Sequence, residues 1–204
     1  MPQPDIDRTN PWKPVHKSEV FDCRYFVTRS DSVRHRAGEP RPYTHIRMKY
    51  FGIAVVPIDE DGSTTLIGQY RYVLDRFTWE VPRGGGRLDH LPIESAKAEL
   101  SEETGYRADH WLHLFNASAS PGVTDEIAPC FVAWGLHQGE PHPDPVEQLV
   151  RRRIPFRDAV AMALSGEIGD LASIASILGI NTRMGRGELP PDLMALLREE
   201  ASSG

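Results

Sequence analysis

Residues 82–106 read P-R-G-G-G-R-L-D-H-L-P-I-E-S-A-K-A-E-L-S-E-E-T-G-Y. After the glycine run at 84–86, the sequence predicts a helix from Pro92 to Thr104, because proline suits a first helical turn and Gly105 suits a C-terminal cap. Apolar residues recur along this segment with helical spacing, which predicts one buried face. The residues of that face are Ile93, Ala96 and Leu100.

The predicted helix carries three carboxylates near its C-terminal end, at Glu99, Glu102 and Glu103. Positions three and four apart share one face, so these groups repel one another, and the helix dipole disfavours negative charge at this end. A divalent cation such as Mg²⁺ or Mn²⁺, which prefers hard oxygen ligands, would resolve both conflicts. A solvated acidic face is the alternative. The glycine loop at 82–86 favours a ligand, because such a backbone can approach one closely.

The composition is that of an ordinary globular protein. The chain has 204 residues, 40% apolar and 25% charged, with a formal net charge of -6. We expect one domain and no nucleic-acid surface, since the basic run at 151–153 is short. We expect neither secretion nor membrane insertion, because no signal core and no apolar run of roughly 20 residues occurs. Cys23 and Cys130 fit no metal spacing, so a reducing cytoplasm is the expected setting.

Outward from the helix, the hydrophobic pattern predicts a mixed sheet with helices packed on it, an α+β fold. An apolar run from Phe51 to Ile58 and a returning strand from Thr65 to Tyr72 predict a hairpin across the turn at 59–62. Further strands are expected at residues 20–27, 32–35, 43–46, 77–81, 111–117, 128–136 and 148–154, and further helices at 155–163, 170–178 and 191–200.

The segment from Gly84 to Tyr106 resembles the Nudix box. That pattern reads Gly, five residues, Glu, seven residues, then Arg-Glu-aliphatic-x-Glu-Glu-x-Gly-aliphatic. Here His90 stands at the first Glu position and Ala98 at the Arg position, while the three later glutamates and the glycine are retained. The resemblance implies a Nudix fold, an α/β/α sandwich, with an intact set of metal-binding glutamates. The two replacements bear on the catalytic rate.

The resemblance extends over about residues 11–180 and narrows the subgroup. The segments Gln69-Tyr70-Arg71, Trp79-Glu80-Val81-Pro82 and Ser120-Pro121-Gly122 are similar to segments of ADP-ribose and nucleoside-diphosphate-sugar pyrophosphatases. Pro121 follows Gly105 at the spacing that marks ADP-ribose hydrolases. Each short motif alone also fits a simple turn or a surface charge. The resemblance to this subgroup therefore rests on the order and spacing of the motifs.

The resemblance implies hydrolysis of the pyrophosphate bond of ADP-ribose or a related nucleoside diphosphate sugar, which gives a nucleoside monophosphate and a sugar phosphate. Mg²⁺ would neutralise phosphate charge and orient the attacking water, with Mn²⁺ as a possible substitute. The implied metal ligands are Glu99, Glu103, Glu102 and the backbone carbonyl of Arg83.

Substrate-binding residues are implied in the same way. A guanidinium group matches phosphate geometry, so Arg71 and Arg83 are the candidate phosphate partners. Trp79 is the candidate for stacking on the base. Glu80 and Pro121 complete the expected substrate-binding set.

A loop at 140–147 is expected to supply the general base. Glu147 is the first candidate and Asp144 the second, with Glu126 as a rival. Together with Glu103 and Glu102, Glu147 forms the expected catalytic set. A base of this kind favours neutral to alkaline pH.

Two alternative functions stay open. The replacements at His90 and Ala98 are compatible with a weakly catalytic sensor that binds nucleotide sugars, although the clustered glutamates argue against a dead site. The box equally fits an enzyme for another nucleoside diphosphate compound, such as GDP-mannose or a dinucleotide.

Three regions are expected along the chain: an N-terminal strand extension over 1–49, a Nudix catalytic domain over 50–180 and a helical tail over 181–204. The strands before residue 50 exceed what a minimal Nudix domain needs, and in relatives such segments help to form homodimers. We therefore predict a homodimer that binds a small nucleotide-sugar substrate, with neither nucleic acid nor membrane as a partner.

Overall fold

The computed structural model describes residues 9–36, 38–142 and 148–202. The chain forms two compact units. The smaller unit comprises Met1–Lys49 and Ser120–Glu126, and the larger unit comprises Tyr50–Ala119 and Ile127–Gly204.

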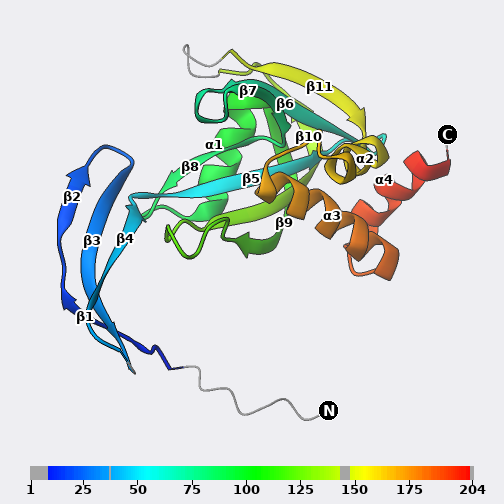
Figure 1. The fold of residues 1–204 in the computed structure, drawn as a ribbon. Coiled ribbons are helices and arrows are strands. Elements are labelled where there is room, and N and C mark those ends of the chain that lie inside the picture. The colour runs from blue at the N-terminus through cyan, green and yellow to red at the C-terminus, as the bar shows by residue number, and fades with distance from the viewer. Residues whose placement is uncertain (1–8, 37, 143–147, 203–204) are drawn as a thin grey trace, which may run out of the picture. The chain divides into compact units, whose positions relative to one another are not determined.

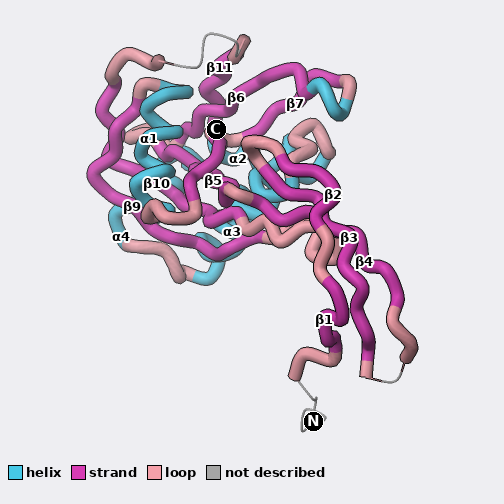
Figure 2. The backbone as a smooth tube through the Cα atoms, turned by 90° about the vertical axis from the view of Figure 1, so that its left-hand side faces the viewer, coloured by secondary structure: helices cyan, strands magenta, loops and turns pink. Residues whose placement is uncertain are grey.

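The smaller unit is a four-stranded antiparallel sheet (Figure 2). Its strands are β1 (Trp12–His16), β2 (Glu19–Asp22), β3 (Phe26–His35) and β4 (Arg41–Met48), and β3 pairs with each of the other three. The single strand predicted at 20–27 is wrong, because the chain turns back between β2 and β3. In that turn the N–H of Cys23 donates to the carbonyl of Phe26 at 3.1 Å, and the Lys49 ammonium donates to the carbonyl of Cys23 at 2.8 Å.

The segment 120–126 is joined to β4 by hydrogen bonds from the backbone of β4. The N–H of Ile46 donates to the carbonyl of Val123 at 2.8 Å, and the N–H of Met48 donates to the Asp125 carboxylate at 2.8 Å. This segment therefore continues the smaller sheet although it lies far along the chain. Among the described residues of this unit, Asp31 alone is buried.

The larger unit contains a seven-stranded mixed sheet. Its central order is β11-β6-β5-β10-β9, with β7 on β6 and β8 on β5. The pair β5–β10 is parallel, and the other pairs are antiparallel. The strands are β5 (Tyr50–Ile58), β6 (Ser63–Arg71), β7 (Arg76–Glu80), β8 (Arg83–Arg87), β9 (Tyr106–Ala117), β10 (Ala128–Gln138) and β11 (Val150–Pro155). The predicted hairpin is confirmed as β5–β6.

Four helices of the described chain pack on this sheet: α1 (Pro92–Thr104), α2 (Phe156–Ser165), α3 (Leu171–Arg186) and α4 (Pro191–Ser202). A short 3₁₀ turn, η1 (Tyr72–Leu74), follows β6. The predicted bounds of α1 are confirmed, and Gly105 caps it with a left-handed φ of 80°. Helix α3 runs past the predicted end at Leu178, because Ile180 continues its buried face and the left-handed cap comes only at Gly187.

Alternation along β5 places the sheet between two helical layers (Figure 1). Ile53 and Val55 pack with Ala96 and Leu100 of α1, while the intervening side chains face α2, α3 and α4 in the larger core. Successive residues of a strand point to opposite faces, so the continuous apolar run of β5 supplies both cores. The predicted α+β sandwich with an N-terminal antiparallel extension is confirmed.

The C-terminal segment contributes to the same core. Leu189, Leu193 and Leu197 are nearly inaccessible to solvent and pack in the cluster formed by α2, α3 and β10. Within the described ranges, no helix has both the length and the apolar character needed to cross a membrane.

Candidate functional site

Two of the three clustered glutamates of α1 reach back to the segment that precedes the helix. Glu103 is 4% exposed, and its Oε2 accepts a hydrogen bond from the N–H of Arg83 at 3.0 Å. Glu99 is half-buried, and its Oε1 accepts from the N–H of Gly85 at 3.1 Å. Glu102 lies exposed on the helix surface. The helix thus brings Glu99 and Glu103, but not Glu102, onto one backbone segment.

The predicted glycine loop is in fact strand β8, and this expectation was wrong. Gly84 to Gly86 pair antiparallel with Ile53 to Phe51 of β5. The glycines are needed for close packing. A Cβ on Gly84 would overlap the Glu99 carboxylate, and a Cβ on Gly86 would overlap the Phe51 ring. The missing side chain at residue 84 therefore creates the space that the Glu99 carboxylate occupies.

A pocket of about 440 Å³, lined by both charged and apolar side chains, adjoins this strand in the larger unit. Three of the predicted substrate-binding residues line it, namely Arg71, Glu80 and Arg83. Strands β6, β7 and β8 supply them, and the turn before α3 closes another side. The pocket is connected to the acidic helix through Arg83, whose side chain lines the pocket and whose N–H binds Glu103.

Glu80 organises the floor of this pocket. It is 2% exposed, and its Oε1 accepts from the Arg71 guanidinium at 2.6 Å and from the Gln69 amide at 2.9 Å. Its Oε2 lies 4.0 Å from the Arg83 guanidinium. A buried carboxylate is costly unless it is paired and hydrogen-bonded, and these partners supply that compensation. Glu80 thereby fixes the direction of Arg71.

Sequence reasoning missed the partner of Arg83. The Arg83 guanidinium forms an ion pair with Asp170, the residue that caps the N-terminus of α3. The signal available in the sequence was Asp170 itself, because Asp directly before an apolar helical segment is typical of a helix start. That pattern locates the helix but does not name a partner for the cap.

Trp79 does not line the pocket of Arg71 and Arg83. It lies on the other face of β7 from Glu80, because neighbouring strand residues alternate. Its ring meets the Phe77 ring edge-on at 5.3 Å between centroids, and the Arg152 guanidinium lies 5.7 Å from its centroid. It also packs against the larger core.

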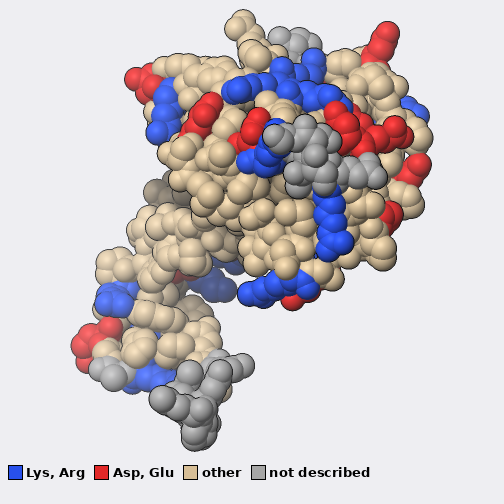
Figure 3. All heavy atoms as spheres, turned by 90° about the vertical axis from the view of Figure 1, so that its right-hand side faces the viewer, with Lys and Arg blue, Asp and Glu red and all other residues tan. Residues whose placement is uncertain are grey.

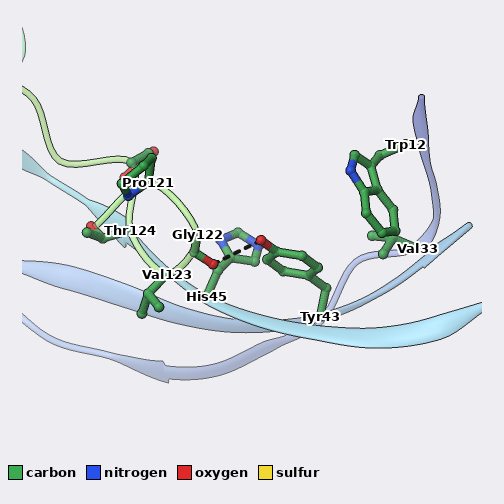
Figure 4. Close-up of a pocket in the computed structure, with 9 residues that line it drawn as sticks. Trp12, Val33, Tyr43, His45, Pro121, Gly122, Val123 and Thr124 are labelled. Carbon is green, nitrogen blue, oxygen red and sulfur yellow. Dashed lines mark hydrogen bonds between the residues drawn. The ribbon is translucent and has the colours of Figure 1, made fainter. Parts of the chain in front are cut away.

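Pro121 lies in the smaller unit and lines a different pocket there, of about 290 Å³ (Figure 4). Trp12 and Tyr43 also line it, and the Tyr43 hydroxyl donates to the carbonyl of Gly122 at 2.9 Å. Beside it, His45 Nε2 lies 3.2 Å from the Asp31 carboxylate. Burial acts to raise the pKa of Asp31, but hydrogen bonds with His45 and with the N–H of Ser18 outweigh it and lower that pKa.

The remaining predicted residues fall elsewhere. Glu147 and Asp144 lie outside the described residues. Glu126 belongs to the smaller unit, where its N–H donates to the Thr124 hydroxyl at 3.1 Å. His90 and Ala98, the two replaced positions, are both exposed.

The basic run Arg151–Arg153 on β11 has acidic and carbonyl partners. Arg151 donates to the carbonyl of Glu103, Arg152 lies 3.6 Å from Glu167, and Arg153 pairs with two aspartates of the β5–β6 turn. Figure 3 shows one face of the molecule, on which both basic and acidic side chains occur. These arginines therefore act within the fold, and Arg151 stabilises the C-terminal end of α1.

No family model matches the chain. It is, however, 32% identical over 163 residues to an ADP-ribose pyrophosphatase of Mycobacterium tuberculosis, and the match covers 76% of each protein. The chain belongs to the Nudix hydrolase family. It is a Nudix pyrophosphohydrolase.

Two further comparisons agree with the Nudix assignment. A GDP-mannose pyrophosphatase of Yersinia enterocolitica is 34% identical over 121 residues, which cover 54% of this chain and 62% of that protein. A crystal structure of an ADP compounds hydrolase superposes with a TM-score of 0.79, covering 90% of this chain and all of the other at 19% identity. That likeness shows the Nudix fold.

Nudix enzymes typically use a divalent metal. Over residues 9–36, 38–142 and 148–202, no three His, Cys, Asp or Glu side chains gather closely enough to hold a metal ion. The donor chemistry still fits Mg²⁺, because Glu99 and Glu103 place hard carboxylate oxygens on one backbone segment. The space left by Gly84 is filled by one of these carboxylates, so the strand is shaped around a ligand group.

Proposed function

We propose that this Nudix enzyme hydrolyses the pyrophosphate bond of ADP-ribose or a related nucleoside diphosphate sugar with Mg²⁺. The products would be a nucleoside monophosphate and a sugar phosphate. The observation that carries the proposal is the double role of Arg83, which lines the pocket beside Arg71 and Glu80 while its N–H holds Glu103 of the acidic helix. A phosphate bound in the pocket would thus be next to the carboxylates proposed to hold the metal.

Glu99 and Glu103 are the proposed first metal ligands, and Glu102 and the carbonyl of Arg83 are proposed to complete the shell. When bound, Mg²⁺ would neutralise phosphate charge and orient water for attack. The chain's own contribution is to hold both carboxylates in place. Each carboxylate accepts a hydrogen bond from a backbone N–H of β8. Both side chains are therefore already ordered before a cation binds.

Arg71 and Arg83 are the proposed phosphate ligands. Each already pairs with a carboxylate, Glu80 and Asp170 respectively. A guanidinium has five N–H donors in a planar fork, so it can keep a carboxylate partner and still bind a phosphate oxygen. The carboxylates therefore orient these arginines before the substrate binds, which lowers the entropic cost of binding.

Glu147 remains the proposed general base, with Asp144 and Glu126 as its rivals. It would take a proton from the attacking water as the new oxygen–phosphorus bond forms and the bridging oxygen–phosphorus bond breaks. The leaving phosphate departs with that bridging oxygen. Such a base must be ionised, so we propose that activity falls on acidification. Trp79 and Pro121, the other expected substrate contacts, do not line the pocket of Arg71 and Arg83 and are given no contact in it.

The names of the relatives support a nucleoside diphosphate sugar as the substrate, but they do not distinguish ADP-ribose from a GDP-sugar. The relative from Mycobacterium tuberculosis is an ADP-ribose pyrophosphatase and that from Yersinia enterocolitica a GDP-mannose pyrophosphatase. A GDP-sugar is accordingly the second candidate substrate. A weakly catalytic sensor is the third candidate, since His90 and Ala98 replace the Glu and Arg of the box.

The test is a screen of nucleoside diphosphate sugars and dinucleotides with Mg²⁺, in which released nucleoside monophosphate is quantified. We expect ADP-ribose to give the highest kcat/KM. Faster turnover of GDP-mannose would select the second candidate. Tight binding without turnover of any compound would overturn the proposed hydrolysis and favour the sensor.

The metal ligands are tested by Glu103→Gln, with Glu94→Gln as the matched control. Gln keeps an oxygen that can accept the Arg83 N–H but removes the charge, whereas Glu94 lies on the exposed first turn of α1 and pairs with Lys97. We expect Glu103→Gln to lower kcat by more than about 10–100-fold, the loss that even outer partners of a metal cause. Glu94→Gln should match the wild type. Full activity of Glu103→Gln would exclude the metal-helix assignment.

We further propose that the enzyme is cytoplasmic and forms a homodimer through its N-terminal extension, residues 1–49, with the catalytic domain over 50–180. Free Cys23 and Cys130 thiols are compatible with a reducing compartment. The exposed apolar side chains of the smaller unit support the dimer.

A further inference from the structure

The N-terminus of α3 makes a chain of hydrogen bonds to the backbone just before β8. Ser173 is fully buried, and its Oγ accepts from the N–H of Val81 at 3.1 Å. The same hydroxyl donates to Asp170 Oδ2 at 2.7 Å, and the N–H of Ser173 donates to that oxygen at 2.8 Å. Helix α3 thus holds Val81 through one shared hydroxyl.

The second oxygen of Asp170 serves a different partner. Asp170 Oδ1 pairs with the guanidinium of Arg83, while Oδ2 caps the helix. A helix cap needs one side-chain oxygen, so capping alone does not account for the ion pair. Glu80 lies 4.0 Å from the same guanidinium. Arg83 is therefore held between a carboxylate from β7 and one from the start of α3.

These bonds hold both ends of the short segment 81–83. Ser173 binds the backbone at Val81, and Asp170 binds the side chain of Arg83. The backbone N–H of Arg83 in turn holds Glu103. A displacement of this segment would move a phosphate-facing arginine and a carboxylate of the acidic helix together.

We propose that Asp170, together with Ser173, is a positioning residue of the pyrophosphatase site. It acts through Arg83, keeping the guanidinium directed into the pocket, and through the backbone at Val81. The inference rests on the proposed function, because Arg83 is taken there as a phosphate ligand. Asp170 itself needs no contact with the substrate.

The main variant is Asp170→Asn, which retains a good helix-capping side chain but removes the charge that faces Arg83. We expect KM for the nucleoside diphosphate sugar to rise about 10-fold, the effect of one charge-assisted hydrogen bond. We expect kcat to change less than about 3-fold, since a lost binding contact acts mainly on KM. Asp192→Asn, at the first turn of α4, is the matched control and should leave both constants unchanged.

The coupling to Arg83 is tested by repeating Asp170→Asn in an Arg83→Gln background. If Asp170 acts through Arg83, the second substitution should add less than about 2-fold to KM, because contacting residues are not additive. A full 10-fold increase in that background would overturn the proposal. So would an unchanged KM in the single variant.

Two readouts do not depend on turnover. Calorimetry with AMP in EDTA should show about 10-fold weaker binding for Asp170→Asn than for the wild type and Asp192→Asn. Hydrogen exchange should show loss of protection at the Val81 amide in Ser173→Ala. Intact protection there would overturn the role of Ser173. If the wild type hydrolyses no nucleotide sugar, the proposed function fails, whereas the exchange result still decides the positioning of residues 81–83.

Discussion

At the scale of single residues, the three glycines of β8 have three different environments. A Cβ on Gly84 would overlap the end of the flexible Glu99 side chain, and one on Gly86 would overlap the Phe51 ring in the core. A Cβ on Gly85 would meet its nearest atom, the carbonyl oxygen of Phe51, at an ordinary 3.7 Å. A side chain would therefore meet a carboxylate at Gly84, only ordinary van der Waals contacts at Gly85 and the core at Gly86.

The first prediction concerns Gly84→Ala. The new methyl group should displace the Glu99 carboxylate from β8 and lower Mg²⁺-dependent kcat by more than about 10-fold, while the melting temperature stays close to that of the wild type. A Mg²⁺ titration of activity should require a higher metal concentration. Gly85→Ala is the control and should keep its activity. Equal activity of the two variants would contradict the role of Glu99.

The second prediction concerns Gly86→Ala. Its methyl group would overlap the Phe51 ring and the Ser95 hydroxyl. Both side chains are buried, so neither can move aside into solvent. Overpacking of this kind typically costs about 1–3 kcal/mol of the free energy of unfolding. Denaturant unfolding of Gly86→Ala and Gly85→Ala measures the difference. The same denaturation midpoint for both variants would contradict this prediction, because it would show that the core beside α1 accommodates the methyl group.

At the scale of elements, a hydrogen bond between side chains joins α4 to the sheet beside an apolar interface. The indole N–H of Trp134 on β10 donates to Asp192 Oδ2 at 2.7 Å, at the first turn of α4. Around it, Leu193 and Leu197 are buried in the larger core. The hydrogen bond from Trp134, as the largest influence, lowers the pKa of Asp192 below its usual range.

This shift gives the third prediction, a loss of stability on acidification. A carboxyl group whose pKa is lower in the folded chain stabilises the fold above its unfolded pKa, about 3.9 for Asp, and loses that contribution as pH falls through the folded pKa. The melting temperature of the wild type should exceed that of Asp192→Asn near neutral pH, and the gap should narrow below about pH 4. A gap that stays constant down to pH 2.5 would contradict this account.

At the scale of the whole molecule, the described residues of the smaller unit form no apolar core of their own. Among them Asp31 alone is buried, whereas Val20, Phe21 and Tyr25 are each more than half exposed. A sheet must bury an apolar face against another layer to be stable. The fourth prediction is therefore a homodimer that covers these side chains.

Light scattering should give about twice the chain mass of 22.9 kDa. Phe21→Asp should shift the mass toward one chain, because a charge placed in an interface opposes association. Leu164→Asp is the control, since Leu164 is an exposed apolar residue on α2 of the larger unit. A single-chain mass for the wild type would refute the dimer.

Local sequence was enough to predict the elements whose signals lie within one segment. The cap at Gly105, the apolar face of α1 and the turn before β6 each arise from residues near in sequence, and the structure confirms them. Strand β8 could not be recognised, because a glycine run has no side-chain alternation to reveal a strand. The length of α3 was missed because its interior Gly179 resembles a stop.

The fold class and the acidic helix could be predicted from the sequence, because helical and strand periodicity and the spacing of the box are properties of neighbouring residues. The surroundings of the arginines depend on contacts between distant segments. Asp170 lies 87 positions from Arg83, and Ser173 lies 92 from Val81. Such pairs form only when α3 packs against the sheet. The reason for glycine at residues 84 and 86 could not be predicted either. A side chain there would overlap a carboxylate of α1 or a ring of β5, and these groups approach β8 only after folding.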